Sequence, residues 1–422
     1  MEKFIVHGGE PLAGEVTIGG AKNHALKLFA ASVLFEDPIT IQNVPLIEDI
    51  FRMKELLEGL GAKITKTGQN DFCIDSSGIF RTDLDREITK RFRASVVLVG
   101  PLLARFGRVS LPHPGGCVFG ERPIDLFIAG FEQMGAQFKE KDDCYVFEAD
   151  NLRGADFTFR IPSVTVTETL MLAAVLTEGK VTLRNAACEP EIEALAHYLN
   201  SAGAKIRGAG TQTIVIEGLG KHARLKSNKP SQIIPDRIEA GSFLILGSLL
   251  ATDLRIKKCR PEHLASLIVH LEAAGVNVEV GSDWMGVCRP ETFTSLDLKT
   301  REYPGFPTDL QAPFSVFLTQ TKGKSQVFET VFDGRLEYMI DLKRMGAEIT
   351  ICDPHRAIIL GPTPLHGREM ESPDLRAGLA FVIAALVAKG RSTIHNVYQI
   401  DRGYERIEEK LKQINANIKR VD

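Results

Sequence analysis

The sequence lacks any apolar run approaching the roughly 18 residues that a membrane-spanning helix needs. Its first residues carry no apolar stretch typical of a signal peptide, and Met1 to His7 are expected to form a strand. The seven cysteines are scattered, and no two of them form a C-x-x-C pair. This spacing argues against a disulfide framework and against a structural zinc site, so we expect a cytoplasmic protein.

Neither sign of charge is in excess. The 51 basic and 54 acidic residues leave a formal net charge of −3, so the chain as a whole has no attraction to nucleic acid or to an anionic membrane. A site for an anion must therefore be built from a local cluster of basic residues. Apolar residues make up 44% of the 422 residues and charged residues 25%, a mixture typical of a globular protein with two or three domains.

The sequence does contain a repeat, with a period of about 70 residues, that fills the chain. Each copy has a stretch with apolar residues at i, i+3, i+4 and i+7, which predicts an amphipathic helix. A glycine then ends the helix, because glycine tolerates the left-handed C′ conformation and asparagine is the next best residue there. These positions are Gly61, Gly135, Gly203, Gly275, Gly346 and Asn415.

A second and more apolar stretch recurs in most copies of the repeat. Such stretches are expected to form buried helices, and the clearest span residues 25–35, 95–106, 169–176, 242–252 and 379–388. Short repeats usually stack into a solenoid, but a unit of this length with one buried and one amphipathic helix favours a closed arrangement. In such an arrangement the apolar helices pack together at the centre, and the sheets cover them on the outside. We therefore expect an α/β fold of six units, divided into two groups of three.

Basic residues occur at several of the expected helix starts. Lys22 stands in G-G-A-K-N before the first apolar helix, where glycines let an anion approach free N–H groups, although the spacing is not that of a Walker A loop. The other basic residues are Arg93, Arg122, Arg335, Arg376 and Arg402. Taken singly, each is compatible with a capped turn, a solvated arginine or a simple ion pair. If the repeats converge, these cations converge too and form a cleft for phosphate.

Two further residues are candidates for chemistry. Cys117 lies in a glycine- and proline-rich loop, five residues before Arg122, and exposure beside basic groups makes a thiol reactive. The other six cysteines are interpreted as small apolar fillers. Asp309, in F-P-T-D-L-Q, is either a helix cap or a functional carboxylate.

Taken in order, the motifs of this chain resemble those of the UDP-N-acetylglucosamine 1-carboxyvinyltransferase family, a group of enolpyruvyl transferases. The motifs are G-G-A-K-N, F-R-A-S, P-G-G-C-x-x-G-x-R-P-x-D-L, P-D-R-I-E-A-G, F-P-T-D-x-Q, D-L-R-A and D-R-G-Y-E-R-I. The resemblance runs from end to end. It implies a two-domain inside-out α/β barrel with three pseudo-repeats in each domain. One domain would span residues 22–233, and the other residues 1–21 and 234–422.

The same resemblance implies a reaction and the residues that perform it. The enolpyruvyl group of phosphoenolpyruvate would pass to the 3-hydroxyl of UDP-N-acetylglucosamine with release of phosphate, the first committed step of peptidoglycan synthesis. Lys22 and Arg402 would bind phosphoenolpyruvate, Cys117 would protonate its methylene carbon, and Asp309 would accept the hydroxyl proton. The family's loop cysteine is alkylated by the epoxide antibiotic fosfomycin.

The residues expected to contact the two substrates are Lys22, Asn23, Arg93, Arg122, Pro123, Ile124, Asp125, Leu126, Ser163, Val164, Asp309, Val331, Arg335, Arg376 and Arg402. No metal or organic cofactor is implied, because cations already neutralise the phosphates. The expected partners are the two small-molecule substrates, without nucleic acid or membrane, and the oligomeric state stays open.

The chain departs from the family pattern near the loop and the nucleotide contacts. The departures are His113-Pro114 before the glycine pair, Thr165 in place of glycine, Phe127 in place of histidine and Asp333-Gly334 in place of Glu-Asn. The residues of the transfer chemistry are unchanged.

Three other functions stay open at this point. A 3-phosphoshikimate 1-carboxyvinyltransferase shares the repeat, but its motifs lack the Gly-Gly-Cys loop. A non-catalytic UDP-sugar-binding relative would have little reason to keep Lys22, Cys117, Asp309 and Arg402 together. A redox sensor at Cys117 is disfavoured, because no resolving cysteine lies near it in the sequence.

Overall fold

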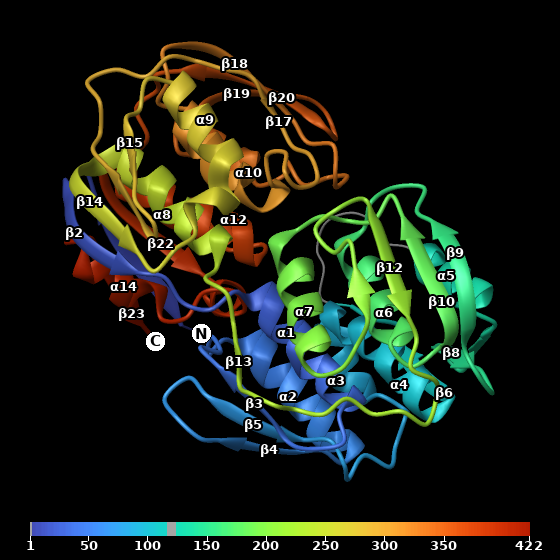
Figure 1. Ribbon diagram of the computed structural model, residues 1–422. Helices are drawn as coiled ribbons and strands as arrows, with labels where there is room; N and C mark the ends of the chain where they lie inside the picture. Colours follow the sequence, from blue (N-terminus) through green and yellow to red (C-terminus); the bar gives the residue numbers. More distant parts are fainter. Residues whose placement is uncertain (1, 116–123) are drawn as a thin grey trace. The chain divides into compact units, whose positions relative to one another are not determined.

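The computed structural model describes residues 2–115 and 124–422, which form two compact units (Figure 1). Unit 1 comprises residues 2–19 and 235–422, and unit 2 comprises residues 20–115 and 124–234. Each unit has its own hydrophobic core. Unit 1 is therefore built from both ends of the chain, and unit 2 from its middle.

The described residues of unit 2 form three sheets. Their strand orders are β13 (Ser231–Gln232), β3 (Ile39–Gln42), β5 (Phe72–Asp75), β4 (Lys63–Lys66); β11 (Ile206–Arg207), β12 (Thr213–Glu217), β10 (Glu178–Arg184), β9 (Arg153–Thr158); and β6 (Arg108–Pro112), β8 (Cys144–Glu148), β7 (Gln137–Lys141). The helices are α1 (Lys22–Ala31), η1 (Ser32–Leu34), α2 (Glu48–Leu60), α3 (Arg86–Arg91), η2 (Arg93–Leu98), α4 (Val99–Phe106), α5 (Asp125–Gln133), α6 (Val164–Ala174) and α7 (Pro190–Ser201), where η denotes a 3-10 helix.

The described residues of unit 1 also form three sheets. Their strand orders are β21 (Glu369–Glu371), β22 (Gly390–His395), β1 (Lys3–Gly8), β23 (Asn417–Val421); β15 (Val278–Val280), β16 (Trp284–Val287), β14 (Ala251–Lys257), β2 (Leu12–Thr17); and β17 (Leu298–Lys299), β18 (Gly323–Phe328), β20 (Arg356–Gly361), β19 (Glu348–Asp353). The helices are α8 (Arg237–Leu250), η3 (Pro261–Leu264), α9 (Ala265–Ala273), η4 (Thr308–Leu310), α10 (Gln311–Leu318), α11 (Met339–Arg344), α12 (Leu375–Val387), α13 (Tyr398–Asp401) and α14 (Ile407–Gln413).

Each four-stranded sheet is mixed, with one parallel pair at an edge followed by antiparallel pairs. In unit 1, for example, β2 runs parallel to β14 while β16 runs antiparallel to it. The first strand, β1, pairs with both β22 and β23, so that Val6 lies opposite Ser392 on one side and Ile418 on the other. This pairing joins the two ends of the chain in one sheet and confirms the expected N-terminal strand. The predicted α/β class is also confirmed.

The apolar stretches form buried helices, as the sequence predicts. Every residue of α8 is buried, because its side chains are apolar on nearly all sides. The structure adds α10, an equally buried helix that is absent from the five predicted stretches. Both α8 and α12 contact α10, and in Figure 1 these three helices lie together with the strands of unit 1 outside them.

The predicted helix ends carry the expected backbone geometry. At all six repeat positions φ is positive, with values of 115°, 91°, 108°, 94°, 111° and 67° at Gly61, Gly135, Gly203, Gly275, Gly346 and Asn415. This left-handed conformation is costly for most residues with a Cβ, which explains why glycine or asparagine recurs there.

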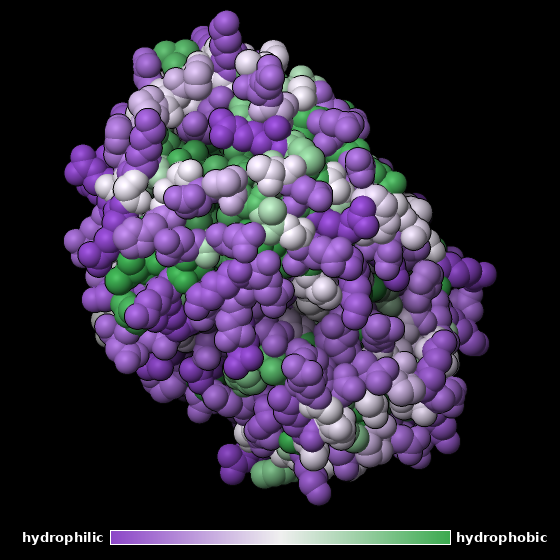
Figure 2. Space-filling model, turned by 90° about the vertical axis from the view of Figure 1, so that its left-hand side faces the viewer, coloured by the Kyte–Doolittle hydropathy of each residue, from purple (hydrophilic) through white to green (hydrophobic). Residues whose placement is uncertain are grey.

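The surface is mostly hydrophilic on the face drawn in Figure 2, where hydrophobic residues occur in small groups. The most exposed large hydrophobic residues among those described are Phe80, Ile161, Val269 and Val280, which come from both units. Among the described residues, no helix combines the length and the apolar character that crossing a membrane requires.

Candidate active site

Asp309 is held between two arginines in unit 1. It lies in η4, immediately before the buried helix α10. Arg335 Nη2 donates to Asp309 Oδ1 at 2.9 Å, and Arg376 Nε and Nη2 donate to Asp309 Oδ2 at 3.1 and 2.9 Å. The arginine side chains are only 4% and 5% exposed, whereas the aspartate side chain is 27% exposed. The carboxylate is thus the accessible part of a largely buried ionic cluster.

The two guanidinium groups determine the charge of Asp309. Burial alone would raise the pKa of this carboxyl, but the charges of Arg376 and Arg335 outweigh burial and hold the pKa well below its ordinary value. Burial likewise opposes the charge of Arg376, yet Asp309 and Tyr404 raise its pKa above the ordinary value. Asp309 and Arg376 are therefore both ionised at neutral pH.

Several neighbours that the sequence analysis did not single out orient this cluster. Arg335 Nη1 donates to Thr308 Oγ1 at 2.6 Å, and Thr308 Oγ1 in turn donates to Glu329 Oε2 at 2.9 Å. Arg376 Nη1 donates to the hydroxyl of Tyr404 at 2.9 Å. Thr308 belongs to the motif F-P-T-D and Tyr404 to D-R-G-Y, so both residues could have been identified as site residues from these motifs.

Backbone contacts place two of the predicted residues at this site. Asp374 caps α12 by accepting hydrogen bonds from the N–H groups of Arg376 and Ala377, which fixes the start of the helix that carries Arg376. The N–H of Val331 donates to Glu329 Oε1 at 2.8 Å. Since the other oxygen of Glu329 accepts from Thr308, one carboxylate connects Val331 to the Asp309 cluster.

Arg402 is also buried, but it does not lie at a helix start as most of the predicted cations do. It caps the C-terminal end of α13, and its Nη1 donates to Gln399 Oε1 at 3.0 Å. The expectation of a helix start is therefore wrong for Arg402, and also for Arg335, which lies in the turn that precedes α11. The short helix α13 ends at Asp401, the first residue of D-R-G-Y, so Arg402 follows the helix instead of opening one.

The predicted residues of unit 2 gather at helix starts. Lys22 is the first residue of α1, and its Nζ lies 2.5 Å from Asp49 Oδ2 near the start of α2. Asn23 follows Lys22 in α1, Arg93 opens η2, and Ser163 and Val164 stand at the start of α6. Because η2 contacts both α1 and α6, the structure makes these three helices neighbours.

Gly20 explains how the chain enters this region. A Cβ at Gly20 would come within 1.9 Å of the carbonyl oxygen of Asn43, so a larger residue does not fit without moving the backbone. The N–H of the next residue, Ala21, donates to the carbonyl of Ile234. The glycine in G-G-A-K-N therefore serves close backbone packing directly before Lys22.

The predicted nucleotide contacts are described only in part. Ile124 is the N-cap of α5, Asp125 is its first residue and forms an ion pair with Arg160, and Leu126 is buried. Cys117, Arg122 and Pro123 are predicted site residues that lie outside the described residues.

Two cysteines differ from expectation. Cys288 and Cys352 are exposed, so the interpretation as apolar fillers is wrong for them. Cys288 directly follows β16, and Cys352 lies near the end of β19. Cys259 fits the interpretation, because it is buried in the core of unit 1.

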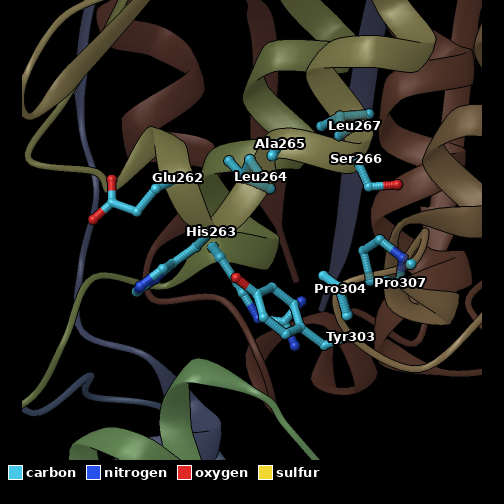
Figure 3. Close-up of a pocket in the computed structure, with 11 residues that line it drawn as sticks. Glu262, His263, Leu264, Ala265, Ser266, Leu267, Tyr303, Pro304 and Pro307 are labelled. Atoms are coloured by element: carbon cyan, nitrogen blue, oxygen red, sulfur yellow. The ribbon is translucent and has the colours of Figure 1, made fainter. Parts of the chain in front are cut away.

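A small hollow in unit 1 lies beside the segment that precedes Asp309 (Figure 3). Tyr303, Pro304 and Pro307 face residues of η3 and α9 across it, and the Arg237 guanidinium lies 5.6 Å from the Tyr303 ring centre. None of Asp309, Arg335 and Arg376 lines this hollow. We therefore assign the candidate active site to the Asp309 cluster, where the ionised groups of unit 1 meet, and not to the hollow.

Comparison with solved structures identifies the class of fold. The enolpyruvyl transferase NikO from Streptomyces tendae superposes with a TM-score of 0.89 at 25% sequence identity, over all of this chain and 99% of that one. An EPSP synthase from Acinetobacter baumannii superposes with a TM-score of 0.73 at 18% identity, over the full length of both chains. The chain thus has the α/β fold of the enolpyruvyl transferases.

Comparison of sequences narrows this class. The family described as EPSP synthase (3-phosphoshikimate 1-carboxyvinyltransferase) matches residues 6–411. Relatives from Desulforapulum autotrophicum and Acidobacterium capsulatum are 42% and 44% identical over all of this chain and 100% and 96% of theirs. Both are named UDP-N-acetylglucosamine 1-carboxyvinyltransferase. The chain belongs to this family of transferases, which confirms the resemblance seen in its motifs.

Proposed function

We propose that this protein transfers the enolpyruvyl group of phosphoenolpyruvate to the 3-hydroxyl of UDP-N-acetylglucosamine and releases phosphate, as the first committed step of peptidoglycan synthesis. The observation that carries the proposal is the match, at 42% and 44% identity over the whole chain, to relatives that bear this name. The Asp309 cluster supports it, because the transfer needs a carboxylate beside cations that can meet an anionic substrate.

Asp309 is the proposed acceptor of the sugar hydroxyl proton. Arg335 and Arg376 keep it ionised, as a base must be before the reaction, but the same cations make it a weak base. We propose that the phosphate or carboxylate of the substrate engages these arginines and weakens their hold on Asp309. The pKa of Asp309 then rises when substrate is bound, which brings the base closer to the pH at which it works.

The remaining steps are assigned to residues that the resemblance implies. Lys22, Asn23, Arg93, Arg122 and Arg402 are the proposed contacts of phosphoenolpyruvate. The sugar oxygen bonds to the carbon that bears the phosphate, its proton goes to Asp309, and Cys117 donates a proton to the methylene carbon. The phosphate leaves when its C–O bond breaks, and the former methylene carbon returns a proton to the Cys117 thiolate, which restores the double bond. Residues 122–126, Ser163, Val164 and Val331 are the proposed contacts of UDP-N-acetylglucosamine.

We also propose the finer architecture that the sequence predicts. It is a two-domain inside-out α/β barrel, with residues 22–233 in one domain and residues 1–21 and 234–422 in the other. The three sheets and the buried helices in each described unit support this proposal. A reducing compartment such as the cytoplasm is the proposed place of action, since the cysteines show no spacing typical of a disulfide framework.

A phosphate-release assay tests the proposed reaction. The purified chain is incubated with phosphoenolpyruvate and either UDP-N-acetylglucosamine or shikimate 3-phosphate. We expect release with the nucleotide sugar only. Release with shikimate 3-phosphate alone would establish the other carboxyvinyltransferase. Binding of UDP-N-acetylglucosamine without release, measured by calorimetry, would establish a non-catalytic relative.

A further inference from the structure

A buried ion pair links two helices of unit 2 beneath the residues assigned to substrate. Lys27 Nζ in α1 lies 3.0 Å from Glu168 Oε2 in α6, and the side chains are 6% and 0% exposed. Lys27 follows Lys22 by five residues, and Glu168 follows Ser163 by five. At the rise of an α-helix, both charges lie about 7.5 Å inside the helix ends that carry the assigned contacts.

The two helices that the pair joins also share neighbours. Both α1 and α6 contact η2 at one place and α7 at another. Ion-pair geometry is specific in distance and direction, whereas apolar contacts between helices tolerate sliding. We therefore expect the charged pair to specify the register of α1 against α6.

The electrostatic surroundings of Glu168 make the pair sensitive to its partner. Within the part of the chain that the structure describes, neither oxygen of Glu168 has a hydrogen bond of regular geometry, so the 3.0 Å contact with Lys27 compensates its charge. The charged groups that face Glu168 are Lys27 from α1 and Glu191 and Glu189 from the start of α7. Burial raises the pKa of Glu168 to about 7 against the lowering by Lys27, and the two glutamates add to the rise.

We propose that Lys27 and Glu168 are positioning residues, which hold the start of α1, with Lys22 and Asn23, in register with the start of α6, with Ser163 and Val164. This inference rests on the proposed function for the identity of the substrates. It assigns to the pair no contact with substrate and no proton transfer. Its effect is on the alignment of the phosphoenolpyruvate contacts with the nucleotide-sugar contacts.

The first test removes both charges without leaving either buried alone. Replacing a buried ion pair by apolar residues of similar size is often neutral for stability, so the double variant Lys27→Met/Glu168→Leu should keep a melting temperature near that of the wild type. We expect its KM for phosphoenolpyruvate to rise about tenfold to a hundredfold, because small misplacements of contacts cost that much. Lys27→Arg keeps the charge and should keep a KM near that of the wild type.

A matched control separates loss of register from loss of stability. Val181, in the middle of β10, is fully buried and makes no ion pair, so Val181→Ala should lower the melting temperature and leave both KM values unchanged. A double variant with wild-type KM values for both substrates would overturn the proposal. Equal increases in KM in the double variant and in Val181→Ala would also overturn it.

The second test uses pH and requires no apolar variant. Above about pH 7 the wild-type Glu168 is ionised, whereas Glu168→Gln lacks this charge, so the ratio of the variant's KM to the wild-type KM should be largest there. Below about pH 7 protonation of Glu168 should bring this ratio towards one. The titration of the substrate itself cancels in the ratio. A ratio that does not change with pH would contradict the proposal.

Hydrogen exchange makes the test independent of activity. Amide exchange over residues 22–31 and 163–174 should be faster in the double variant than in the wild type and unchanged in Val181→Ala. If the wild type releases no phosphate, the proposed function is wrong. The hydrogen-exchange result still shows whether Lys27 and Glu168 hold the two helices in register. Unchanged exchange over both segments would then reject the positioning proposal.

Discussion

Arg376 donates two hydrogen bonds to the same oxygen of Asp309 and a third to the hydroxyl of Tyr404. Arg376 lies near the start of α12. Its guanidinium therefore connects α12 to the carboxylate that precedes α10 and to the tyrosine that follows α13. Asp309 and Tyr404 lie 67 and 28 residues from Arg376 in the sequence. The fixed fork of arginine suits this role, because its N–H groups point in defined directions.

The first prediction concerns the proposed base. Asp309→Asn should lower kcat about a hundredfold to ten-thousandfold, because the amide cannot accept the hydroxyl proton. Asp341→Asn is a matched control, since Asp341 is equally exposed at 27% and binds the exposed Arg344. We expect the control to keep its kcat in the phosphate-release assay. An unchanged kcat in Asp309→Asn would show that the carboxylate only supports the arginines.

Asp309→Asn should also be less stable than the wild type by about 3 kcal/mol, because two buried guanidinium groups lose their counterion. The pKa of Asp309 is lower in the folded protein than its ordinary value of 3.8. The stabilisation is therefore complete above about pH 4 and is lost as the pH falls through the folded-state pKa. Urea denaturation of both proteins at neutral and at strongly acidic pH measures this difference. A difference that grows towards acid would contradict the assignment.

The second prediction concerns Arg402. Arg402→Ala should raise the KM for phosphoenolpyruvate about tenfold to a hundredfold, the usual effect of losing a charged hydrogen bond to an anion. The loss of its bond to Gln399 should cost about 1.5–3 kcal/mol of stability, because the donor is charged. Arg406→Ala, in the same motif but 71% exposed and paired with Glu409, serves as the control. Equal KM values in the two variants would make Arg402 a structural residue.

The third prediction concerns the stability of unit 2. The pKa of Glu168 is raised in the folded protein from 4.5 to about 7, so the folded state binds more protons than the unfolded state between these values. The wild type should therefore lose roughly 3 kcal/mol of stability relative to Glu168→Gln as the pH rises through this range. Denaturation curves at pH 4.5, 6 and 8 measure the change. A constant difference would show that Glu168 has an ordinary pKa.

The fourth prediction concerns cysteine reactivity. A limiting amount of an alkylating reagent should label Cys117 first, because its motif places it in a glycine-rich loop near Arg122. Burial raises the pKa of Cys259 to about 11, so this thiol should react last. Peptide mass mapping measures the order, with the exposed Cys288 and Cys352 as internal controls. Labelling of either control before Cys117 would contradict the role assigned to the loop cysteine.

Substitutions of Cys117 test its role as a proton donor. Cys117→Asp should keep measurable activity and resist fosfomycin, because a carboxyl can still donate a proton. Cys117→Ser should be far less active, because a hydroxyl is a much weaker acid. Full activity in Cys117→Ser, measured by phosphate release, would show that Cys117 is not the donor.

The local structure of this protein was largely predictable from its sequence. The positions from Gly61 to Asn415 that end the amphipathic helices all have positive φ, because a helix end depends on the few residues around it. The buried helices were visible as apolar stretches for the same local reason. The helix that follows Asp309, α10, was expected only through Asp309 as a helix cap. It was not among the clearest apolar stretches, since it is short and contains a proline, although all its residues are buried.

The candidate site was predictable as a set of residues and not as a set of contacts. The motifs named Asp309, Arg335, Arg376 and Arg402, but not that the first three bind one another while Arg402 binds Gln399. Lys27 lay within a stretch predicted to be a buried helix, where a charge requires a partner. The position of Lys27 thus indicated a buried ion pair, although it did not identify Glu168 as the partner.

By itself, then, the sequence determined where helices end, which helices are buried and which family's motifs the chain carries, because these depend on neighbouring residues or on short ordered patterns. Only the tertiary structure decided which charges meet. Lys27 and Glu168 come from helices that are far apart in the sequence, and so do Asp309 and Arg376. Their pairing follows from how buried helices pack, and burial in turn makes each pairing necessary, since an isolated charge in the interior is too costly.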